Sequence, residues 1–336
     1  MEESKKPVMR VPKEEGQRVL ERLKEENDLD PSRQIQEEND HLLIPVKEGG
    51  TEERSDLEER TSDDDPPFRK IQRRLDLPEK EKEILPNRWE MIGEVLLIKL
   101  PEELHGKKEE IGGAYAEVLG AKTVMLQGGI EGRKREPKVE KIYGKETETV
   151  HLENGISYKL DTADIMFSSG NIDERIRMAE VVEEGEVIID MFAGIGYFSL
   201  PMAVHGDPDK VYALEINPTA FHYLRDNIKL NGVEKIVEAW HGDNRDFSFK
   251  GADRVVMGYL HETWKYLDKA VGFIEDEGTI HYHTTCLDSD FPEGVKEELE
   301  DDLDEDFEIL TIKKIKSYAP HVFHAVADVR VEKTKF

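Results

Sequence analysis

The stretch that decides the fold is Asp190-Met191-Phe192-Ala193-Gly194-Ile195-Gly196-Tyr197-Phe198-Ser199. It follows the apolar run 187–189, which predicts a buried strand, and the residues after it predict a helix. Two glycines between a strand and a helix let the backbone approach a ligand closely at the carboxyl end of a parallel sheet. A dinucleotide fingerprint requires a third glycine where this chain has Ser199, so the turn disfavours a nicotinamide or flavin dinucleotide.

Two further positions indicate an adenosyl ligand. Glu215 ends the next predicted strand, at the spacing where an acidic side chain accepts hydrogen bonds from both hydroxyls of a ribose. Past the next predicted helix, Gly242-Asp243-Asn244 supplies an acidic and an amide side chain that could recognise the edge of an adenine. The alternative is a glycine turn that only permits tight packing. The predicted binding residues of this sheet are Asp190, Gly194, Gly196, Glu215, Asp243 and Asn244.

Strands and helices alternate from about residue 172 onward, as in a parallel α/β sheet. Strands are predicted over 187–190, 211–215, 254–257 and 279–282. Asn217 can cap the helix after the second of these strands, with Pro218 in its first turn, and Gly232 can end that helix. The predicted fold class is therefore α/β, with a Rossmann-like domain over residues 168–336.

The preceding residues divide into smaller parts. A short amphipathic helix and a strand predict a small amino-terminal unit over residues 1–47, and residues 48–67 have the composition of a flexible acidic linker. Residues 68–167 predict an α+β domain that positions RNA, with a strand running from Trp89 to about Pro101 and a helix over 108–119. Asn154-Gly155 predicts a hairpin, because tight primed turns require positive φ values.

The composition is strongly acidic, with 75 acidic against 47 basic residues and a formal net charge of −28. This excludes a uniformly basic nucleic-acid binder but not a local basic patch on an acidic body. An acidic partner-binding segment and an adaptation to high salt both account for the charge. Because acidic residues occur throughout the chain, we favour a halophilic-type acidic surface.

Other features exclude several kinds of site. A single cysteine, Cys286, excludes an intramolecular disulfide framework and a cysteine-cluster metal site. No stretch resembles a signal peptide or a membrane span, so we expect a cytoplasmic protein that does not contact a membrane. His261, His281 and His283 are predicted near one edge of the sheet, where a metal site is conceivable. His281 and His283 share a strand face, but no cysteine or clear third ligand accompanies them, so we expect structural or hydrogen-bonding roles and no metal.

Several collinear motifs give the chain a resemblance to a known family. They are Leu85-Pro86-Asn87-Arg88-Trp89, Ile165-Met166-Phe167-Ser168, Glu174-Arg175-Ile176-Arg177-Met178, the glycine turn, Gly242-Asp243-Asn244-Arg245-Asp246-Phe247, Met257-Gly258-Tyr259, Ile280-His281-Tyr282-His283 and Tyr318-Ala319-Pro320. From residue 85 onward the chain resembles the archaeal wyosine-pathway enzymes, which transfer the 3-amino-3-carboxypropyl group of S-adenosylmethionine to 4-demethylwyosine in tRNA(Phe). These enzymes are sisters of the tRNA guanine-37 N1-methyltransferases. Residues 12–46 resemble a small domain that some members carry.

The resemblance implies a class I S-adenosylmethionine-dependent fold, a tRNA(Phe) substrate modified at position 37, and release of 5′-methylthioadenosine. It also implies that Ser168 and Arg175 hold the methionine moiety of the donor, with Arg175 pairing with its carboxylate. Taken alone, Arg175 reads as a surface arginine paired with an acidic neighbour, and Ser168 as a helix cap. The catalytic base is not assigned.

Two departures separate this chain from the sister methyltransferases. Those enzymes show Asn-Leu-Pro after the fourth strand, where this chain has Gly258-Tyr259-Leu260. They also carry an arginine soon after a Phe-Ser-Pro motif, where this chain has Gly170 after Phe167-Ser168-Ser169. Both departures favour aminocarboxypropyl transfer over methyl transfer.

Two basic patches predict contacts with RNA. Each supplies charge for phosphates, and an aromatic ring beside the second could stack on a base, although each patch alone also reads as a solvated surface. The candidates are Arg133, Lys134, Arg135, Lys313, Lys314, Lys316 and Tyr318.

Three other functions compete with this one. A tRNA guanine-37 N1-methyltransferase has the same fold. A catalytically silent RNA-binding protein would need a broken adenosyl site, whereas the predicted binding residues are all present. A small-molecule methyltransferase leaves residues 68–165 unexplained. No obligate protein partner is inferred.

Overall fold

The computed structural model describes residues 6–26, 28–30, 32–54, 65–131 and 136–333. The chain divides into two compact units, Met1–Asn87 and Arg88–Phe336. The finer predicted division, into residues 1–47, 48–67, 68–167 and 168–336, stays a prediction.

The first unit contains a small sheet covered by one helix. Apolar residues of α1 and of the strands, among them Leu23 and Ile44, form a common core. All strand pairs are antiparallel, in the order β2-β3-β1-β4. Strand β4 lies inside the range predicted as linker, because Glu52–Arg54 pairs with β1. The elements are β1 (Lys6–Pro12), α1 (Gly16–Glu25), β2 (Gln36–Glu38), β3 (His41–Pro45), β4 (Glu52–Arg54), α2 (Pro67–Arg74) and α3 (Glu79–Glu83).

The second unit begins with a four-stranded sheet in the order β5-β6-β7-β8. The strand predicted to run on from Trp89 is in fact a hairpin, because Gly93 adopts a φ of 54° and turns the chain between β5 and β6. The helix predicted over 108–119 is confirmed as α4 and ends at Gly120, whose φ is 74°. The elements are β5 (Trp89–Ile92), β6 (Val95–Ile98), α4 (Lys108–Leu119), β7 (Thr123–Glu131) and β8 (Glu136–Tyr143).

The hairpin predicted at Asn154-Gly155 is confirmed as β9 (Glu148–Glu153) and β10 (Ile156–Asp161), with φ values of 48° and 77° at the two turn residues. Two asparagines attach the hairpin to the next domain. One lies in α7 (Pro218–Leu230) and the other directly follows it. Asn227 Oδ1 accepts from the backbone amide of Lys159 at 2.7 Å, and Asn231 Oδ1 accepts from that of Ser157 at 2.9 Å.

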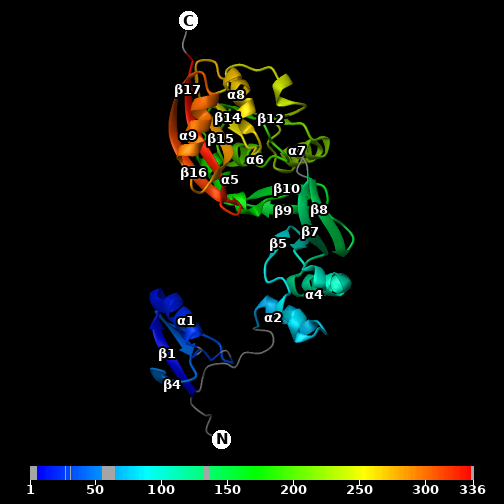
Figure 1. Ribbon diagram of the computed structural model, residues 1–336, viewed down its shortest axis with the longest axis vertical. Coiled ribbons are helices and arrows are strands. Elements are labelled where there is room, and N and C mark those ends of the chain that lie inside the picture. The colour runs from blue at the N-terminus through cyan, green and yellow to red at the C-terminus, as the bar shows by residue number, and fades with distance from the viewer. Residues whose placement is uncertain (1–5, 27, 31, 55–64, 132–135, 334–336) are drawn as a thin grey trace. The chain divides into compact units, whose positions relative to one another are not determined.

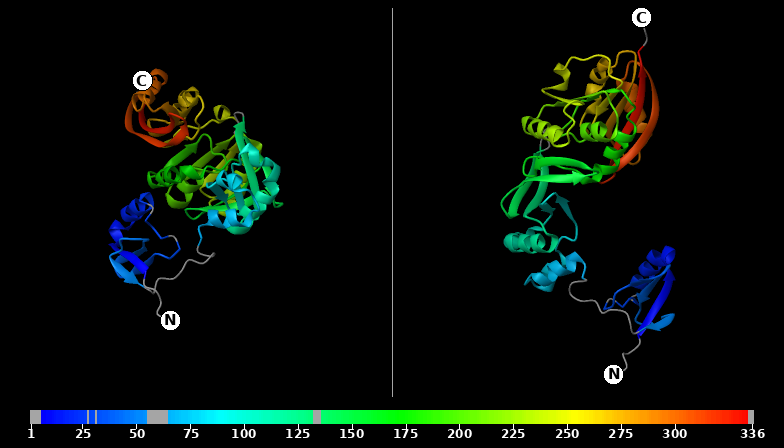
Figure 2. Two further views of the ribbon diagram at one scale, coloured as in Figure 1. Left: turned by 60° about the horizontal axis from the view of Figure 1, so that its bottom comes forward. Right: turned by 180° about the vertical axis from the view of Figure 1, so that it is seen from behind.

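A further sheet of the second unit has seven strands, in the order β13-β12-β11-β14-β15-β17-β16, and several of them are labelled in Figure 1. Its first five strands are parallel and its last two antiparallel, which confirms the predicted α/β, Rossmann-like fold. Figure 2 shows the sheet from two further sides, with the long orange and red strands β16 and β17 at one edge. The strands are β11 (Val187–Asp190), β12 (Lys210–Glu215), β13 (Val237–His241), β14 (Arg254–Met257), β15 (Glu277–Leu287), β16 (Asp306–Ala319) and β17 (Val322–Glu332).

Helices pack against this sheet around two apolar cores, one of which also includes the β9–β10 hairpin. The predicted cap is confirmed, since Asn217 Oδ1 accepts from the amide of Thr219 at 3.0 Å and Pro218 starts α7. Gly232, with a φ of 70°, follows its end. The remaining helices are α5 (Ile172–Glu180), α6 (Ser199–His205), α8 (Leu267–Phe273) and α9 (Glu293–Asp302). Throughout the described ranges, every helix lacks the combination of length and apolar composition needed to cross a bilayer.

Candidate functional site

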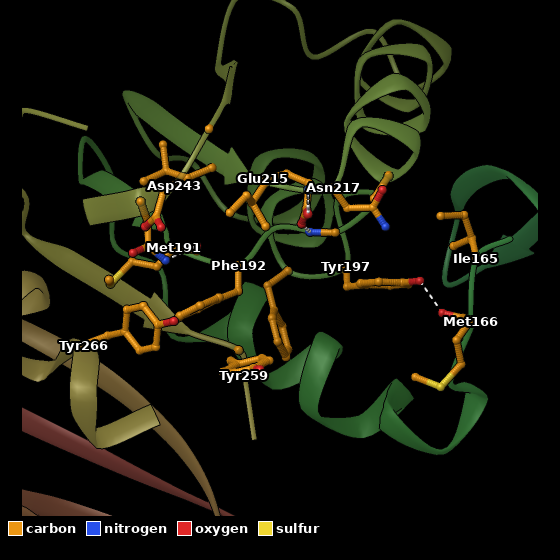
Figure 3. A pocket seen from close by; sticks show the side chains of 18 of the residues that line it. Ile165, Met166, Met191, Phe192, Tyr197, Glu215, Asn217, Asp243, Tyr259 and Tyr266 are labelled. Carbon is orange, nitrogen blue, oxygen red and sulfur yellow. Dashed lines mark hydrogen bonds between the residues drawn. The ribbon is translucent and has the colours of Figure 1, made fainter. Parts of the chain in front are cut away.

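A cavity of about 420 Å³ opens at the carboxyl ends of β11, β12, β13 and β14. Figure 3 shows Asp243 and Tyr266 at one end, Glu215 and Phe192 in the middle, and Tyr197, Ile165 and Met166 at the other end. We call it the first cavity. Of the residues predicted to bind the donor, it is lined by Ser168, Arg175, Gly194, Glu215, Asp243 and Asn244.

The carboxylate of Glu215 is held in place by the backbone. One oxygen accepts from the amide of Gly194 at 2.8 Å, and the other accepts from the amide of Asn217 at 2.6 Å. Burial raises the pKa of Glu215, while these amide hydrogen bonds oppose the shift. Each carboxylate oxygen has more than one acceptor site, so the group can also accept from ribose hydroxyls in the cavity.

The two glycines of the turn have different roles. Gly194, at a φ of 58°, lines the cavity and donates to Glu215. Gly196, at a φ of 104°, lies off the cavity wall, and a Cβ there would be 2.7 Å from Leu200 Cγ and Cδ1. Gly196 therefore permits α6 to pack against the turn rather than touching a ligand.

Asp190 also lies away from the cavity wall, and it is fully buried. Its carboxylate accepts from Ser199 Oγ at 2.7 Å and from the amide of Phe192 at 3.2 Å. Burial raises its pKa to about 6. Asp190 thus ties the two ends of the glycine turn together from beneath.

Asp243 and Asn244 present different groups to the cavity. The Asp243 carboxylate accepts from both the backbone amide and the guanidinium of Arg245. The hydrogen bond from the guanidinium lowers the pKa of the carboxyl. Asn244 donates from Nδ2 to the carbonyl of Met191 at 3.0 Å. Its Oδ1 is buried and has no hydrogen-bond partner among the described residues, which leaves it available to a ligand.

Three aromatic rings form one wall of the first cavity. Phe192 stacks on Tyr259 with centroids 5.0 Å apart and meets Tyr266 edge-on at 5.1 Å. Gly258 also lines the wall, and a Cβ there would be 2.7 Å from a ring carbon of Phe198. This flat apolar surface suits the faces of an adenine.

At the other end of the cavity, Arg175 forms a buried ion pair with Glu153. Its Nε and one terminal nitrogen donate to the two carboxylate oxygens at 2.6 and 2.7 Å. Both terminal nitrogens also donate to the carbonyl of Ser168 at 3.1 Å. Arg175 therefore holds the Ser168 segment against the β9–β10 hairpin.

A second cavity of about 680 Å³ adjoins the first. The two share Met166, Ser168 and Asn171, so these residues form the wall between them. Asn171 Oδ1 is buried and has no hydrogen-bond partner within the described ranges. The second cavity is further lined by Glu90, Gln127, Phe167, Ser169, Gly170, Leu260, His261, Lys316, Ser317 and Tyr318.

The residues predicted to bind RNA are separated by the structure. Lys316 and Tyr318 line the second cavity, and the Tyr318 hydroxyl lies 3.3 Å from His261 Nε2. Lys313 and Lys314 are both exposed, and Lys314 pairs with Asp288 and lies over the rings of Phe291 and Phe323. The predicted patch Arg133, Lys134 and Arg135 lies outside the described residues.

The other two predicted histidines belong to a buried network beneath the sheet. His281 Nδ1 lies 2.6 Å from Asp328, and Arg254 donates to His281 Nε2 at 2.6 Å. Since an arginine only donates, Nε2 accepts and Nδ1 carries the proton. Burial lowers the pKa of His281, and that of His283 well below its ordinary value, so both rings are neutral. Within the described ranges, no three His, Cys, Asp or Glu side chains are placed to hold a metal ion.

The arrangement fits an adenosyl ligand that extends from the aromatic wall toward Ser168. Sequence reasoning missed several wall residues, because an aromatic or an asparagine alone carries little signal. Asn171 follows the Ser168 motif in the sequence without a pattern of its own, although its buried Oδ1, which has no partner among the described residues, marks it as a binding group. The missed residues are Asn171, Phe192, Tyr197, Asn217, Tyr259 and Tyr266.

Comparisons with known proteins match three parts of the chain. Residues 149–310 match the TRM5/TYW2 methyltransferase domain, residues 71–147 the TYW2 N-terminal domain, and residues 9–52 the tRNA methyltransferase 5 N-terminal domain. The third match agrees with the resemblance expected for residues 12–46.

Two curated relatives cover most of the chain. The tRNA(Phe) (4-demethylwyosine(37)-C(7)) aminocarboxypropyltransferase of Pyrococcus horikoshii is 48% identical over 77% of this chain and 94% of that protein. The tRNA (guanine(37)-N(1))-methyltransferase Trm5b of Pyrococcus abyssi is 38% identical over 96% of this chain and 98% of that protein. A crystal structure of P. horikoshii TYW2 in complex with MeSAdo is 45% identical, with a TM-score of 0.73 over 80% of this chain and 100% of that chain.

Proposed function

The chain belongs to the TRM5/TYW2 family, and we propose that it transfers the 3-amino-3-carboxypropyl group of S-adenosylmethionine to 4-demethylwyosine at position 37 of tRNA(Phe). The observation that carries this proposal is the 48% identity to an enzyme of that name over 94% of its length. The reaction releases 5′-methylthioadenosine and is a step in forming wyosine derivatives. We further propose that the protein acts in the cytoplasm, where its tRNA substrate is found.

The wall at Gly258 supports this activity over methyl transfer. The sister methyltransferases resembled by this chain have asparagine at the position of Gly258. Here a Cβ would be 2.7 Å from a ring carbon of Phe198, so an asparagine would displace that ring. The Tyr259 that follows is stacked on Phe192 and supplies a ring where those enzymes have leucine.

Each donor-binding residue has a role consistent with its surroundings. Glu215 accepts from the ribose hydroxyls, Asn244 Oδ1 accepts from the adenine amino group, and the three-ring wall packs on the adenine face. Asp243 reads the adenine edge beside Asn244, while Asp190 and Gly196 keep the turn in shape from behind. The sulfonium of the bound donor supplies the activated carbon, and the protein decides which carbon faces the acceptor.

The second cavity is the natural place for the acceptor nucleotide. It adjoins the methionine end of the first cavity through Ser168 and Asn171, and it contains an aromatic ring, Tyr318, that can stack on a base. Of the RNA-binding candidates, Lys316 and Tyr318 lie here, whereas the exposed Lys313 is available to the phosphate backbone outside this cavity. Arg133, Lys134 and Arg135 stay RNA-binding candidates that lie outside the described residues.

Product analysis tests the proposal. The protein is incubated at high salt with S-adenosylmethionine and tRNA(Phe) carrying 4-demethylwyosine, and the digested nucleosides are weighed by mass spectrometry. We expect a base heavier by one aminocarboxypropyl group, together with 5′-methylthioadenosine. An unchanged tricyclic base in the presence of bound donor would refute the proposal.

The alternative function is tRNA guanine-37 N1 methylation. It is favoured by the match to a methyltransferase over 96% of this chain and by residues 9–52, which match a tRNA methyltransferase 5 domain. The same analysis on unmodified tRNA tests it. Methylated guanosine with S-adenosylhomocysteine would support the alternative, and their absence would exclude it.

A further inference from the structure

The buried arginine at the methionine end of the first cavity already has a full counter-charge. Arg175 and Glu153 form a two-pronged ion pair, with side chains 3% and 7% exposed. A donor carboxylate placed against Arg175 would meet the negative charge of Glu153 as well. The two charges of such a close pair act on a third group from similar distances and with opposite signs. The pair therefore attracts a further anion only weakly.

A second cation lies at the same corner of the cavity. Lys316 Nζ donates to Ser168 Oγ, and Ser168 lines both cavities. The side chain passes over Gly170, where a Cβ would be 3.5 Å from Lys316 Cδ and 3.8 Å from Nζ. Irregular pairing of β16 between Lys314 and Lys316 turns Lys316 toward this wall while Lys314 pairs with Asp288.

An acceptor for an ammonium group lies on the same wall. Asn171 lines both cavities, and its buried Oδ1 has no hydrogen-bond partner in the described part of the chain. An orphaned buried amide oxygen costs free energy unless a ligand or water satisfies it. The wall therefore offers one donor cation and one free acceptor, which is what the zwitterionic end of an amino acid requires.

We propose that the wall between the two cavities binds the amino-acid end of the donor, with Lys316 pairing with its carboxylate and Asn171 accepting from its ammonium group. The inference rests on the proposed use of S-adenosylmethionine. It makes Lys316 a specificity-determining residue, because a carboxylate anchored at the passage presents the methionine side chain, rather than the methyl group, to an acceptor in the second cavity.

Calorimetric titration of the full chain without tRNA tests the assignment with three probes. S-adenosylmethionine carries both charged groups, its decarboxylated analogue keeps only the ammonium, and 5′-methylthioadenosine has neither. For Lys316→Met we expect affinity for S-adenosylmethionine to fall on the order of tenfold or more, with the other two probes unaffected. For Asn171→Ala we expect S-adenosylmethionine and the decarboxylated analogue to bind more weakly, with 5′-methylthioadenosine unaffected.

Two variants serve as controls. Lys313→Met makes the same charge change at an exposed position of the same strand and is expected to leave binding of all three probes unchanged. Lys316→Arg keeps the charge and is expected to restore much of the affinity for S-adenosylmethionine.

The pattern across probes decides the outcome. Equal weakening of all three probes by Lys316→Met would overturn the assignment, since that pattern marks a general distortion of the cavity. The assignment would also be overturned if Lys316→Met bound all three probes with unchanged affinity and raised only the KM for tRNA. That result would assign Lys316 to an RNA phosphate. Because these titrations involve no transfer, they are independent of the product analysis and can fail separately from it.

Discussion

The first cavity and the buried network beneath β15 and β17 contain the same kinds of side chain, used in opposite ways. In the network, Asp328 accepts from His281, from both terminal nitrogens of Arg177 and from Thr311, at distances from 2.6 to 3.2 Å. Although burial alone would raise it, the pKa of Asp328 is lowered by the hydrogen bond from His281 and by the charge and hydrogen bonds of Arg177. At the cavity, Glu215 is held by backbone amides, among them those of Gly194 and Asn217, and the side-chain oxygens of Asn171 and Asn244 have no hydrogen-bond partner among the described residues.

The difference separates structural from functional polar groups. A network that satisfies its own members holds strands and helices together, and it has nothing left for a ligand. A site keeps acceptors unsatisfied toward a cavity and accepts the cost of doing so. Changes in the network should therefore alter stability, and changes at the cavity should alter donor affinity.

The largest effect is expected from Asp328→Ala. It leaves the buried charge of Arg177 with one counter-ion fewer and removes the partner of His281, so we expect the free energy of unfolding to fall by about 3–5 kcal/mol. Denaturant unfolding measures this. Asp226→Ala, which removes a partly exposed partner of Lys159, is the matched control and should cost about 1 kcal/mol or less.

The distinction between the stabilising network and the donor-binding cavity would be contradicted by one result. In it, Asp328→Ala, at temperatures where it is folded, would bind S-adenosylmethionine much more weakly than the wild type. That result would mean that the network acts on the cavity as well as on the fold.

The next effect is expected at the cavity itself. Glu215→Ala removes the acceptor for the ribose and releases the amides of Gly194 and Asn217, so we expect roughly hundredfold weaker binding of S-adenosylmethionine. Stability should change far less than in Asp328→Ala. Calorimetric titration measures the affinity, and unaltered donor binding would remove Glu215 from the site.

The smallest effect concerns Asp190. Its carboxylate is buried like the groups of the network, but it supports the glycine turn of the cavity. Its folded pKa, about 6, is above the ordinary value of 3.8, so the folded state holds its proton more tightly than the unfolded state. The associated stability is complete below pH 3.8 and is lost as the pH rises through 6, by up to about 2 kcal/mol between pH 4 and 6. Asp190→Asn should remove this slope, as unfolding curves at several pH values would reveal. Parallel pH profiles for the variant and wild type would contradict a buried, protonated Asp190.

Much of the fold and of the adenosyl end of the site was predictable because its signals are local. The glycine turn and Asp243-Asn244 come just after strands and Glu215 ends one, and parallel strands bring their carboxyl ends to one edge. The sequence could not separate Gly194, which lines the cavity, from Gly196, which permits helix packing. That distinction depends on where the side chain of Leu200 lies.

The methionine end was harder to predict because its contacts are long-range. The predicted contact of Arg175 with a ligand carboxylate stays a prediction. What the sequence did not anticipate is its pairing with Glu153, which joins a helix to a hairpin 22 residues earlier. Lys316 was grouped with Lys313 and Lys314 as one basic patch. Irregular pairing along β16 sends Lys316 to the second cavity and Lys314 to Asp288 and two rings, and simple alternation along a strand does not anticipate such a bulge.

The most direct test of the central claim is which carbon of the donor reaches the tRNA. S-adenosylmethionine labelled with tritium in its methyl group and with carbon-14 in its carboxyl group is incubated with the protein and tRNA(Phe) bearing 4-demethylwyosine. The account predicts carbon-14 in the tRNA and tritium in released 5′-methylthioadenosine. Tritium in the tRNA with carbon-14 left in S-adenosylhomocysteine would contradict it and identify the protein as a methyltransferase.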